Sequence, residues 1–183
     1  GRRAEIGPWK GVTVYTNLTD LNENLKGLEV ATSYLTRSGS NIICMVNEYR
    51  NATSASTSFE SLIAMFLQLG GPQDKYATII PGRRGESLRR GTKYSSFAST
   101  DLGYAVVTNQ KTGNSICLAT TQSERATIEV IDMAVEYGAH LTSYIDVYLK
   151  PNETRKFVNL AAFTKTKQDA LKYKALRKYR LDR

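Results

Sequence analysis

The sequence predicts an α+β protein in which antiparallel β-strands followed by a helix occur twice, with a basic helical tail at the C-terminus. Three observations predict this class. Short runs of β-branched and aromatic residues alternate with Gly, Asn and Ser clusters, which is typical of strands joined by tight turns. The pattern Thr-x-x-Glu, typical of a capped helix start, occurs at Thr57 and again at Thr121. From residue 165 onward, the chain is rich in Lys and Arg.

The first repeat contains several strands and then a helix. Its predicted strands are residues 9–15, 28–36, 42–49 and 51–57. Arg-Ser-Gly-Ser at residues 37–40 has the composition of a hairpin turn, so the strands on either side of it are predicted to pair. A helix is predicted from Thr57 to Gly70, because apolar residues recur at spacings of three and four. These apolar residues are Phe59, Leu62, Ile63, Phe66 and Leu67.

The second repeat follows the same order. Its predicted strands are residues 76–80, 90–98, 102–109 and 115–120, with a turn at 111–114. The second helix is predicted from Thr121 to about Gly138, with Ile128, Ile131 and Val135 as its apolar line. Connections of hairpin length imply antiparallel pairing, since a parallel crossover needs a dozen or more residues.

We expect one folded domain over residues 1–150 and a basic tail over residues 151–183. A domain of about 150 residues buries roughly two-thirds of its unfolded surface, so it needs no metal or disulfide for stability. Cys44 and Cys117 lie far apart in apolar runs and are predicted to be buried free thiols. No apolar run approaches the roughly 20 residues of a membrane-spanning helix, so no membrane association is expected.

Positive charge is concentrated in two segments of a chain whose net charge is +8. Residues 75–93 contain six basic residues and one acidic residue, and residues 165–183 contain eight basic and two acidic residues. The remainder of the chain is mildly acidic. Such clustering favours a polyanionic partner over a small acidic ligand. The alternative for each segment is an ordinary solvated loop or helix face.

Phosphate binding requires fixed cations, and the planar guanidinium of Arg fits phosphate oxygens well. The leading candidates lie in or beside a glycine-rich connector and are Arg83, Arg84, Arg89, Arg90 and Lys93. Further candidates lie at predicted strand ends or turns and are Lys10, Arg37, Arg50, Lys75 and Lys111. Aromatic residues on strands stack on bases or fill a sheet core. Both alternatives stay open for Tyr15, Tyr34, Tyr49, Tyr94 and Tyr104.

The order of these features resembles the Whirly family. Residues 10–15, Lys-Gly-Val-Thr-Val-Tyr, are similar to the Lys-Gly-Lys-Ala-Ala-Leu motif of plant Whirly proteins, with Val12 in place of the second lysine. The hairpin at residues 37–39, the Pro-Gly-Arg-Arg-Gly loop at residues 81–85 and the second capped helix fall at matching places. The tyrosine-rich, basic character is most similar to the kinetoplastid mitochondrial guide-RNA-binding proteins.

This resemblance implies a Whirly fold and a function in RNA annealing. It implies that the chain binds guide RNA and pre-mRNA through their phosphate backbones, promotes their annealing in RNA editing, and forms a heterotetramer with a related Whirly-fold subunit in the mitochondrion. One alternative is a single-stranded DNA-binding protein of the plant Whirly type. Another is a structural assembly subunit whose basic tail docks on an acidic partner.

No catalytic or metal-binding pattern is present in the sequence. His140 is the sole histidine and has no Cys or carboxylate at metal-ligand spacing. The loop at residues 81–85 lacks the Lys-Ser/Thr ending of a P-loop, and no Ser-His-Asp set or dinucleotide-binding glycine pattern occurs. We therefore expect no enzyme activity, no cofactor and no metal.

Overall fold

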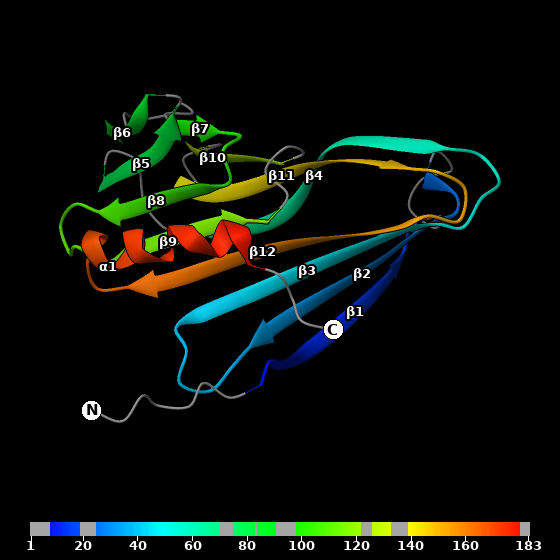
Figure 1. Ribbon diagram of the computed structural model, residues 1–183, viewed down its shortest axis with the longest axis horizontal. Coiled ribbons are helices and arrows are strands. Elements are labelled where there is room, and N and C mark those ends of the chain that lie inside the picture. Colours follow the sequence, from blue (N-terminus) through cyan, green and yellow to red (C-terminus); the bar gives the residue numbers. More distant parts are fainter. Residues whose placement is uncertain are drawn as a thin grey trace.

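The computed structural model shows a mostly β protein with two antiparallel sheets and a short C-terminal helix (Figure 1). It describes residues 8–18, 25–69, 75–82, 84–90, 98–121, 126–132 and 139–179. None of the helices in these ranges has the length and apolar character needed to cross a membrane.

The larger sheet has eight strands in the spatial order β1-β2-β3-β12-β9-β8-β5-β6. Every neighbouring pair in it is antiparallel. In that order, its strands are β1 (Lys10–Asn17), β2 (Leu28–Thr36), β3 (Ile42–Asn51), β12 (Thr154–Thr164), β9 (Ser115–Thr120), β8 (Tyr104–Asn109), β5 (Tyr76–Gly82) and β6 (Gly85–Arg90).

The smaller sheet has four strands in the spatial order β4-β11-β10-β7. These strands are β4 (Thr57–Gln68), β11 (Ala139–Leu149), β10 (Ala126–Asp132) and β7 (Ala98–Thr100). The two sheets pack face to face, and apolar side chains from both fill the space between them, including Leu118, Val130, Leu141 and Ala161. We call the face of the larger sheet that meets the smaller sheet its inner face.

The opposite, outer face of the larger sheet is covered in part by the C-terminal segment. This segment consists of helix α1 (Lys167–Lys172) and a 3-10 turn, Tyr173–Lys178. Ala170 is fully buried and packs with Tyr104 and Cys117, and Leu176 lies beside them. The molecule therefore has three layers over its central strands.

A polar contact also joins the two sheets. The side chain of Asn47 on β3 is buried, and its Nδ2 donates a hydrogen bond of 2.7 Å to the carbonyl oxygen of Ala64 on β4. Its Oδ1 accepts a bond of 3.1 Å from the hydroxyl of Thr32 on β2. Because both ends of the amide have partners, the group is buried without leaving a polar atom unpaired.

The structure confirms several predicted strands and overturns the first predicted helix. Strands β2, β3 and β9 coincide closely with the runs predicted from the sequence. Residues 57–68, in contrast, form β4, which pairs with β11. Two register shifts interrupt this pairing, and each places an extra β4 residue opposite its partner strand. Phe59 and Leu62 consequently both pack against the core although they are three residues apart, as on one face of a helix. Leu67 also packs against the core, while Ile63 stays exposed.

The second predicted helix is also wrong in its described part. Residues 126–132 form β10, in which alternate residues Ala126, Ile128 and Val130 are buried with the period of a strand. Residues 122–125 and 133–138 lie outside the described ranges. The predicted α+β class with Whirly topology is therefore wrong, because residues 57–68 and 126–132 of the two predicted repeat helices form strands of a β-sandwich.

The segment after residue 150 is continuous with the sandwich. Strand β12 lies between β3 and β9 in the middle of the larger sheet, so the residues assigned to a tail supply a central strand. The helix predicted from residue 165 onward is present in its described part as α1 and the following 3-10 turn.

Cys44 and Cys117 are buried and unbridged, as predicted. Burial raises the pKa of Cys44 to about 11 and that of Cys117 to about 12.

Glu86 ties the C-terminal segment to the edge of the larger sheet. Its Oε1 accepts hydrogen bonds from the hydroxyl of Tyr104, at 2.5 Å, and from Nζ of Lys174, at 2.9 Å. The Tyr104 bond and then the Lys174 bond hold the pKa of Glu86 below its ordinary value. The guanidinium of Arg177 lies over the Tyr104 ring at 5.2 Å from its centroid.

We expect Glu86→Gln to flatten the acid side of the stability profile. A carboxyl whose folded pKa is lowered contributes stability above its unfolded pKa, and this contribution is lost as pH falls through the folded pKa. Thermal midpoints measured from about pH 6 down to pH 3, across the ordinary Glu range, should fall less steeply in the variant. Some slope should remain, because Glu153 and Asp169 also have lowered pKa values. Identical slopes for the two proteins would contradict a role for Glu86.

Candidate functional site

A large pocket lies at the end of the sandwich where helix α1 begins, and we call it the α1-end pocket. Its volume is about 1010 Å³. Its walls come from the end of β4, the start of β5, the turn between β8 and β9, the end of β12 and helix α1. Segments far apart in the sequence therefore meet at one end of the larger sheet.

The turn between β8 and β9 is held in shape by Asn109. The side-chain Oδ1 of Asn109 accepts hydrogen bonds from the backbone amides of Lys111, at 3.0 Å, and Thr112, at 3.1 Å. Gly113 adopts a positive φ of 77°, a conformation that glycine adopts without strain. Ser115 donates a bond of 2.9 Å to the Gly113 carbonyl oxygen. The polar side chains of this turn are thus carried on a defined backbone.

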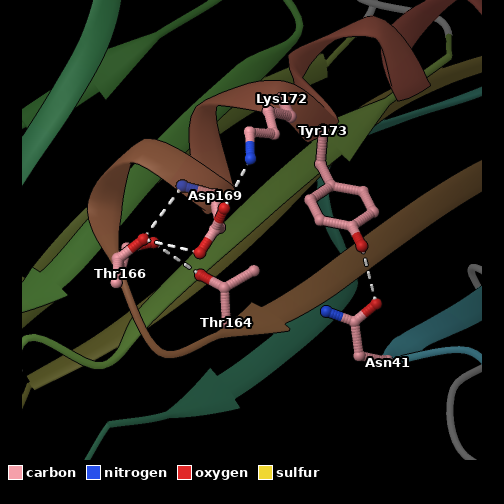
Figure 2. A network of polar contacts seen from close by, with 6 residues as sticks. All are labelled: Asn41, Thr164, Thr166, Asp169, Lys172 and Tyr173. Carbon is pink, nitrogen blue, oxygen red and sulfur yellow. Dashed lines mark hydrogen bonds and ion pairs between the residues drawn. The ribbon is translucent and has the colours of Figure 1, made fainter.

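Tyrosine side chains contribute to two walls of the pocket. Tyr76 on β5 is buried, and its hydroxyl donates a hydrogen bond of 2.6 Å to the carbonyl oxygen of Leu69. Burial raises the pKa of Tyr76, and a hydrogen bond with the Asn109 side chain opposes this rise. On the opposite wall, the Tyr173 hydroxyl donates to Oδ1 of Asn41 at 2.8 Å. Figure 2 shows the Tyr173 ring extending from the helical segment toward Asn41.

A polar network surrounds the first turn of α1 (Figure 2). Thr166 is the N-cap, and its Oγ1 accepts a hydrogen bond of 3.1 Å from the Asp169 amide. The Asp169 carboxylate accepts from the Thr166 hydroxyl at 2.8 Å and pairs with Nζ of Lys172 at 2.6 Å. The Lys172 bond and then the Thr166 bond lower the pKa of Asp169, and Asp169 in turn raises the pKa of Lys172.

The pocket combines amide, hydroxyl, aromatic and charged groups. Its polar side chains include Asn41, Asn109, Thr112, Asn114 and Thr164. Its apolar walls include Ile116 and Phe163, and Asp169 and Lys172 add charge at one side. Within the described residues, no group of three or more His, Cys, Asp and Glu side chains is placed to hold a metal ion. The arrangement can hydrogen-bond a polar ligand while an apolar surface contacts its carbon skeleton.

The predicted phosphate-binding residues are divided between the two ends of the larger sheet. Lys10, Arg37, Lys75 and Lys111 lie at the α1 end, where β1 and β5 start and where the turns after β2 and β8 are found. The backbone amide of Gln110 donates to the Lys75 carbonyl oxygen at 2.8 Å, which brings the segments of Lys75 and Lys111 together. Arg37 stacks on Trp9, with its Cζ atom 4.7 Å from the ring centroid.

The remaining predicted residues are not gathered with that group. Arg50 lies at the opposite end of the sheet and pairs with Glu29 at 2.7 Å. Arg84 is exposed in the turn between β5 and β6, and Arg89 is exposed on the edge strand β6. Arg83 and Lys93 lie outside the described residues, as does the side chain of Arg90. The described candidates therefore do not form one continuous track.

The five tyrosines predicted either to stack on bases or to fill the sheet core differ in their exposure. Tyr49 and Tyr104 are buried in the core, whereas Tyr15 is 81% exposed and Tyr34 is 45% exposed. Tyr94 lies outside the described residues.

Sequence reasoning missed the residues that build the α1-end pocket. Asn109 was assigned only to a strand end, and Thr166 and Asp169 only to a basic tail. A local signal was present, because Thr166-x-x-Asp169 has the spacing of an N-cap and Asn109 precedes a Gly-containing turn. The contact between Tyr173 and Asn41 joins residues 132 positions apart, so no local pattern reveals it.

Structural comparison relates this chain to β-sandwich domains of longer proteins. An α-galactosidase from Lactobacillus brevis superimposes with a TM-score of 0.62 at 14% identity, covering 85% of this chain and 24% of that one. A variant GH36 α-galactosidase from Geobacillus stearothermophilus in complex with stachyose gives a TM-score of 0.60 at 14% identity, covering 86% and 25%. A galactose mutarotase-like protein from Clostridium acetobutylicum gives 0.53 at 12% identity, covering 88% and 66%.

These comparisons establish the fold alone. This chain spans about a quarter of each α-galactosidase and about two thirds of the mutarotase-like protein. No protein-family model and no curated protein sequence matches it. The resemblance to the Whirly family and its guide-RNA-binding members is wrong, because the matching structures and the two-sheet topology are those of a galactose-mutarotase-like β-sandwich.

Proposed function

We propose that this protein binds a carbohydrate in the α1-end pocket. The observation that carries the proposal is the lining of this pocket, in which amide and hydroxyl side chains from separate strands converge beside aromatic and apolar surface. A saccharide presents many hydroxyl groups that both donate and accept hydrogen bonds. Asn side chains offer both a donor and an acceptor, so they match such groups well.

The fixed geometry of the walls supports this proposal. The Asn109 bonds hold the turn that carries Thr112 and Asn114, and the Thr166 cap holds the first turn of α1. Polar groups that are held in place before binding lose little conformational freedom on binding. The apolar wall at Ile116 and Phe163 gives the nonpolar face of a sugar ring a surface to contact.

The structural relatives also support a carbohydrate ligand. Their names describe α-galactosidases and a galactose mutarotase-like protein, and one α-galactosidase structure contains stachyose. This chain spans only part of those proteins, so we propose binding and no catalytic step.

RNA binding is a second candidate, favoured by basic residues near the same pocket. Lys165 and Lys172 line it, and Lys75 and Lys111 are carried by adjoining segments. A saccharide fits the concave, amide-rich lining better, whereas RNA binding requires an extended cationic surface. A role in guide-RNA annealing, a related partner subunit and a mitochondrial location were implied by the Whirly resemblance and lose that support.

We expect Asn114→Ala to weaken stachyose binding by about twofold to tenfold for each hydrogen bond lost. Loss of one or two hydrogen bonds from a neutral amide costs about 0.5–1.5 kcal/mol each, and 1.4 kcal/mol corresponds to tenfold in affinity. Asn114 is exposed in the turn between β8 and β9, so the fold should be retained. Isothermal titration with galactose, raffinose and stachyose measures the effect.

The matched control is Asn152→Gly, which removes an amide side chain from a turn at the opposite end of the sandwich. Asn152 has a φ of 57°, which glycine adopts without strain. The affinity of the Asn152→Gly variant for stachyose should equal that of the unchanged protein. Equal affinities for all three proteins would show that any saccharide binds outside the α1-end pocket.

A further inference from the structure

Strand β1 forms one edge of the larger sheet, and its residues 10–16 are exposed. All eight residues of β1 pair with β2 in an unbroken register. Val12 is 65% exposed, Val14 is 50% exposed and Tyr15 is 81% exposed. Between residues 11 and 17 this strand has no charged residue and no proline. An edge of this kind presents unpaired backbone donors and acceptors to a further strand.

The other three edges in the described structure carry features that discourage such pairing. Strand β6 has charged residues at Glu86, Arg89 and Arg90. Strand β7 is only three residues long. Strand β4 is interrupted by two register shifts against β11. Charges, short length and bulges are the devices by which proteins protect sheet edges. Strand β1 has eight residues, no bulge against β2 and, as its one charged residue, Lys10 at its first position, which distinguishes it from every other described edge.

The exposed side chains of β1 lie on both faces of the sheet. Val12 is opposite Tyr34 on β2, and Val14 is opposite Thr32, so these residues share the inner face. Tyr34 is itself 45% exposed, which extends the apolar surface of the two valines. Tyr15 is opposite Ala31 and therefore lies on the outer face. An added strand at this edge would cover apolar surface on each face.

We propose that two copies of this chain pair through β1, antiparallel, about a two-fold axis that is perpendicular to the sheet and passes midway between Thr13 of one copy and Thr13 of the other. In this register each Val12 lies opposite the partner's Val14, and each Tyr15 lies opposite the partner's Gly11. Lys10, the one charged residue of β1, lies opposite the partner's Thr16, so no like charges face each other. The same seven residues, 10–16, supply both halves of the contact, as a two-fold interface requires.

A second copy of this chain fits the exposed edge because β1 can pair with itself without placing like charges opposite each other. In the two-fold arrangement Val12 and Val14 pair across the axis twice, and each Tyr15 lies across from Gly11, which has no side chain to obstruct it. The larger sheets of the two copies then form one continuous sheet, with their inner faces on the same side. The described residues that line the α1-end pocket include none from β1, so each copy keeps a complete pocket.

In the proposed dimer, Thr13 of one copy lies opposite Thr13 of the other. A charged side chain introduced at this position therefore faces the same charge in the partner copy. We expect the unchanged chain to sediment as a dimer, and Thr13→Lys and Thr13→Glu each to sediment as monomers, because like side chains directly opposite repel. An equimolar mixture of the two variants should form a dimer again, since opposite charges then face each other. Thr154→Lys, which places a lysine at an exposed position on the central strand β12, should stay dimeric.

Sedimentation equilibrium of the full chain and these variants decides between the outcomes, with circular dichroism confirming that each is folded. A monomeric unchanged chain at concentrations up to about 1 mM would overturn the proposal. A dimer that persists in both Thr13 variants would also overturn it, because pairing would then occur elsewhere. If Thr13→Lys and Thr13→Glu are each monomeric and their mixture also stays monomeric, Thr13 does not lie opposite Thr13 of the partner copy. This result would overturn the proposed register.

Discussion

Truncation after Lys150 is expected to abolish cooperative unfolding. The deletion removes β12 from between β3 and β9, so the two halves of the larger sheet lose the strand that joins them. Phe157 and Leu160 on β12 are fully buried. Loss of these two side chains alone costs roughly 5–10 kcal/mol, comparable with the 5–15 kcal/mol by which whole domains are stable.

Thermal unfolding followed by circular dichroism checks this expectation. A truncation after Tyr179 is the matched control, because it removes only residues 180–183 and keeps β12 and α1. The control should unfold in one sharp transition. A sharp transition in the protein that ends at Lys150 would mean that residues 1–150 fold alone, and would contradict the central position of β12.

Phe157→Ala is expected to lower the free energy of unfolding by about 3–5 kcal/mol. The Phe157 ring is fully buried and makes an edge-on contact with Tyr49, at 5.9 Å between ring centroids. Its cluster contains side chains of both sheets, including Leu28 and Leu149, so the cavity left by alanine opens at the contact between the sheets. Chemical denaturation at equilibrium measures the change.

Phe163→Ala on the same strand provides the comparison. Phe163 is 37% exposed, so water already contacts part of the ring and its removal leaves a smaller cavity. We expect a loss of about 1–2 kcal/mol, below the range for a fully buried aromatic side chain. Equal losses at the two positions would contradict the assignment of Phe157 to the interior and Phe163 to the rim of the pocket.

The strands were predictable where turn chemistry marks their ends. Gly39 and Gly113 adopt positive φ values of 73° and 77° in the turns that follow β2 and β8, and the residues flanking each turn were predicted as strands. These signals are local, since a turn is specified by the few residues within it. How the hairpins assemble is decided by contacts between distant segments, such as those of β12 with β3 and β9.

The first helix was predicted wrongly because a bulged strand and a helix can share a residue spacing. The extra residues in β4 shift its inward positions, so Phe59 and Leu62 both contact the core although a regular strand would place them on opposite faces. Thr57 and Glu60 matched a capping pattern, but β4 obtains its backbone partners from β11. Pairing between strands overrides a local capping signal when the segment becomes part of a sheet.

The candidate site was less predictable than the strands. Basic residues are conspicuous in a sequence, and the prediction therefore centred on residues 81–93. The α1-end pocket depends on side chains such as Asn41, Asn109 and Tyr173, which are ordinary in their local sequence and meet only through the fold. Its recognition required the position of β12, which carries the chain to the start of α1.

Amide chemical-shift mapping of the full chain during titration with stachyose, and separately with single-stranded RNA of random sequence, tests the proposed function most directly. Carbohydrate binding in the α1-end pocket predicts that stachyose shifts the amides of residues 109–116 and 163–173, with little change when salt is raised. Shifts caused only by RNA, falling away with salt, would contradict the proposal and favour phosphate binding. The absence of any shift with stachyose in those two segments would contradict it equally.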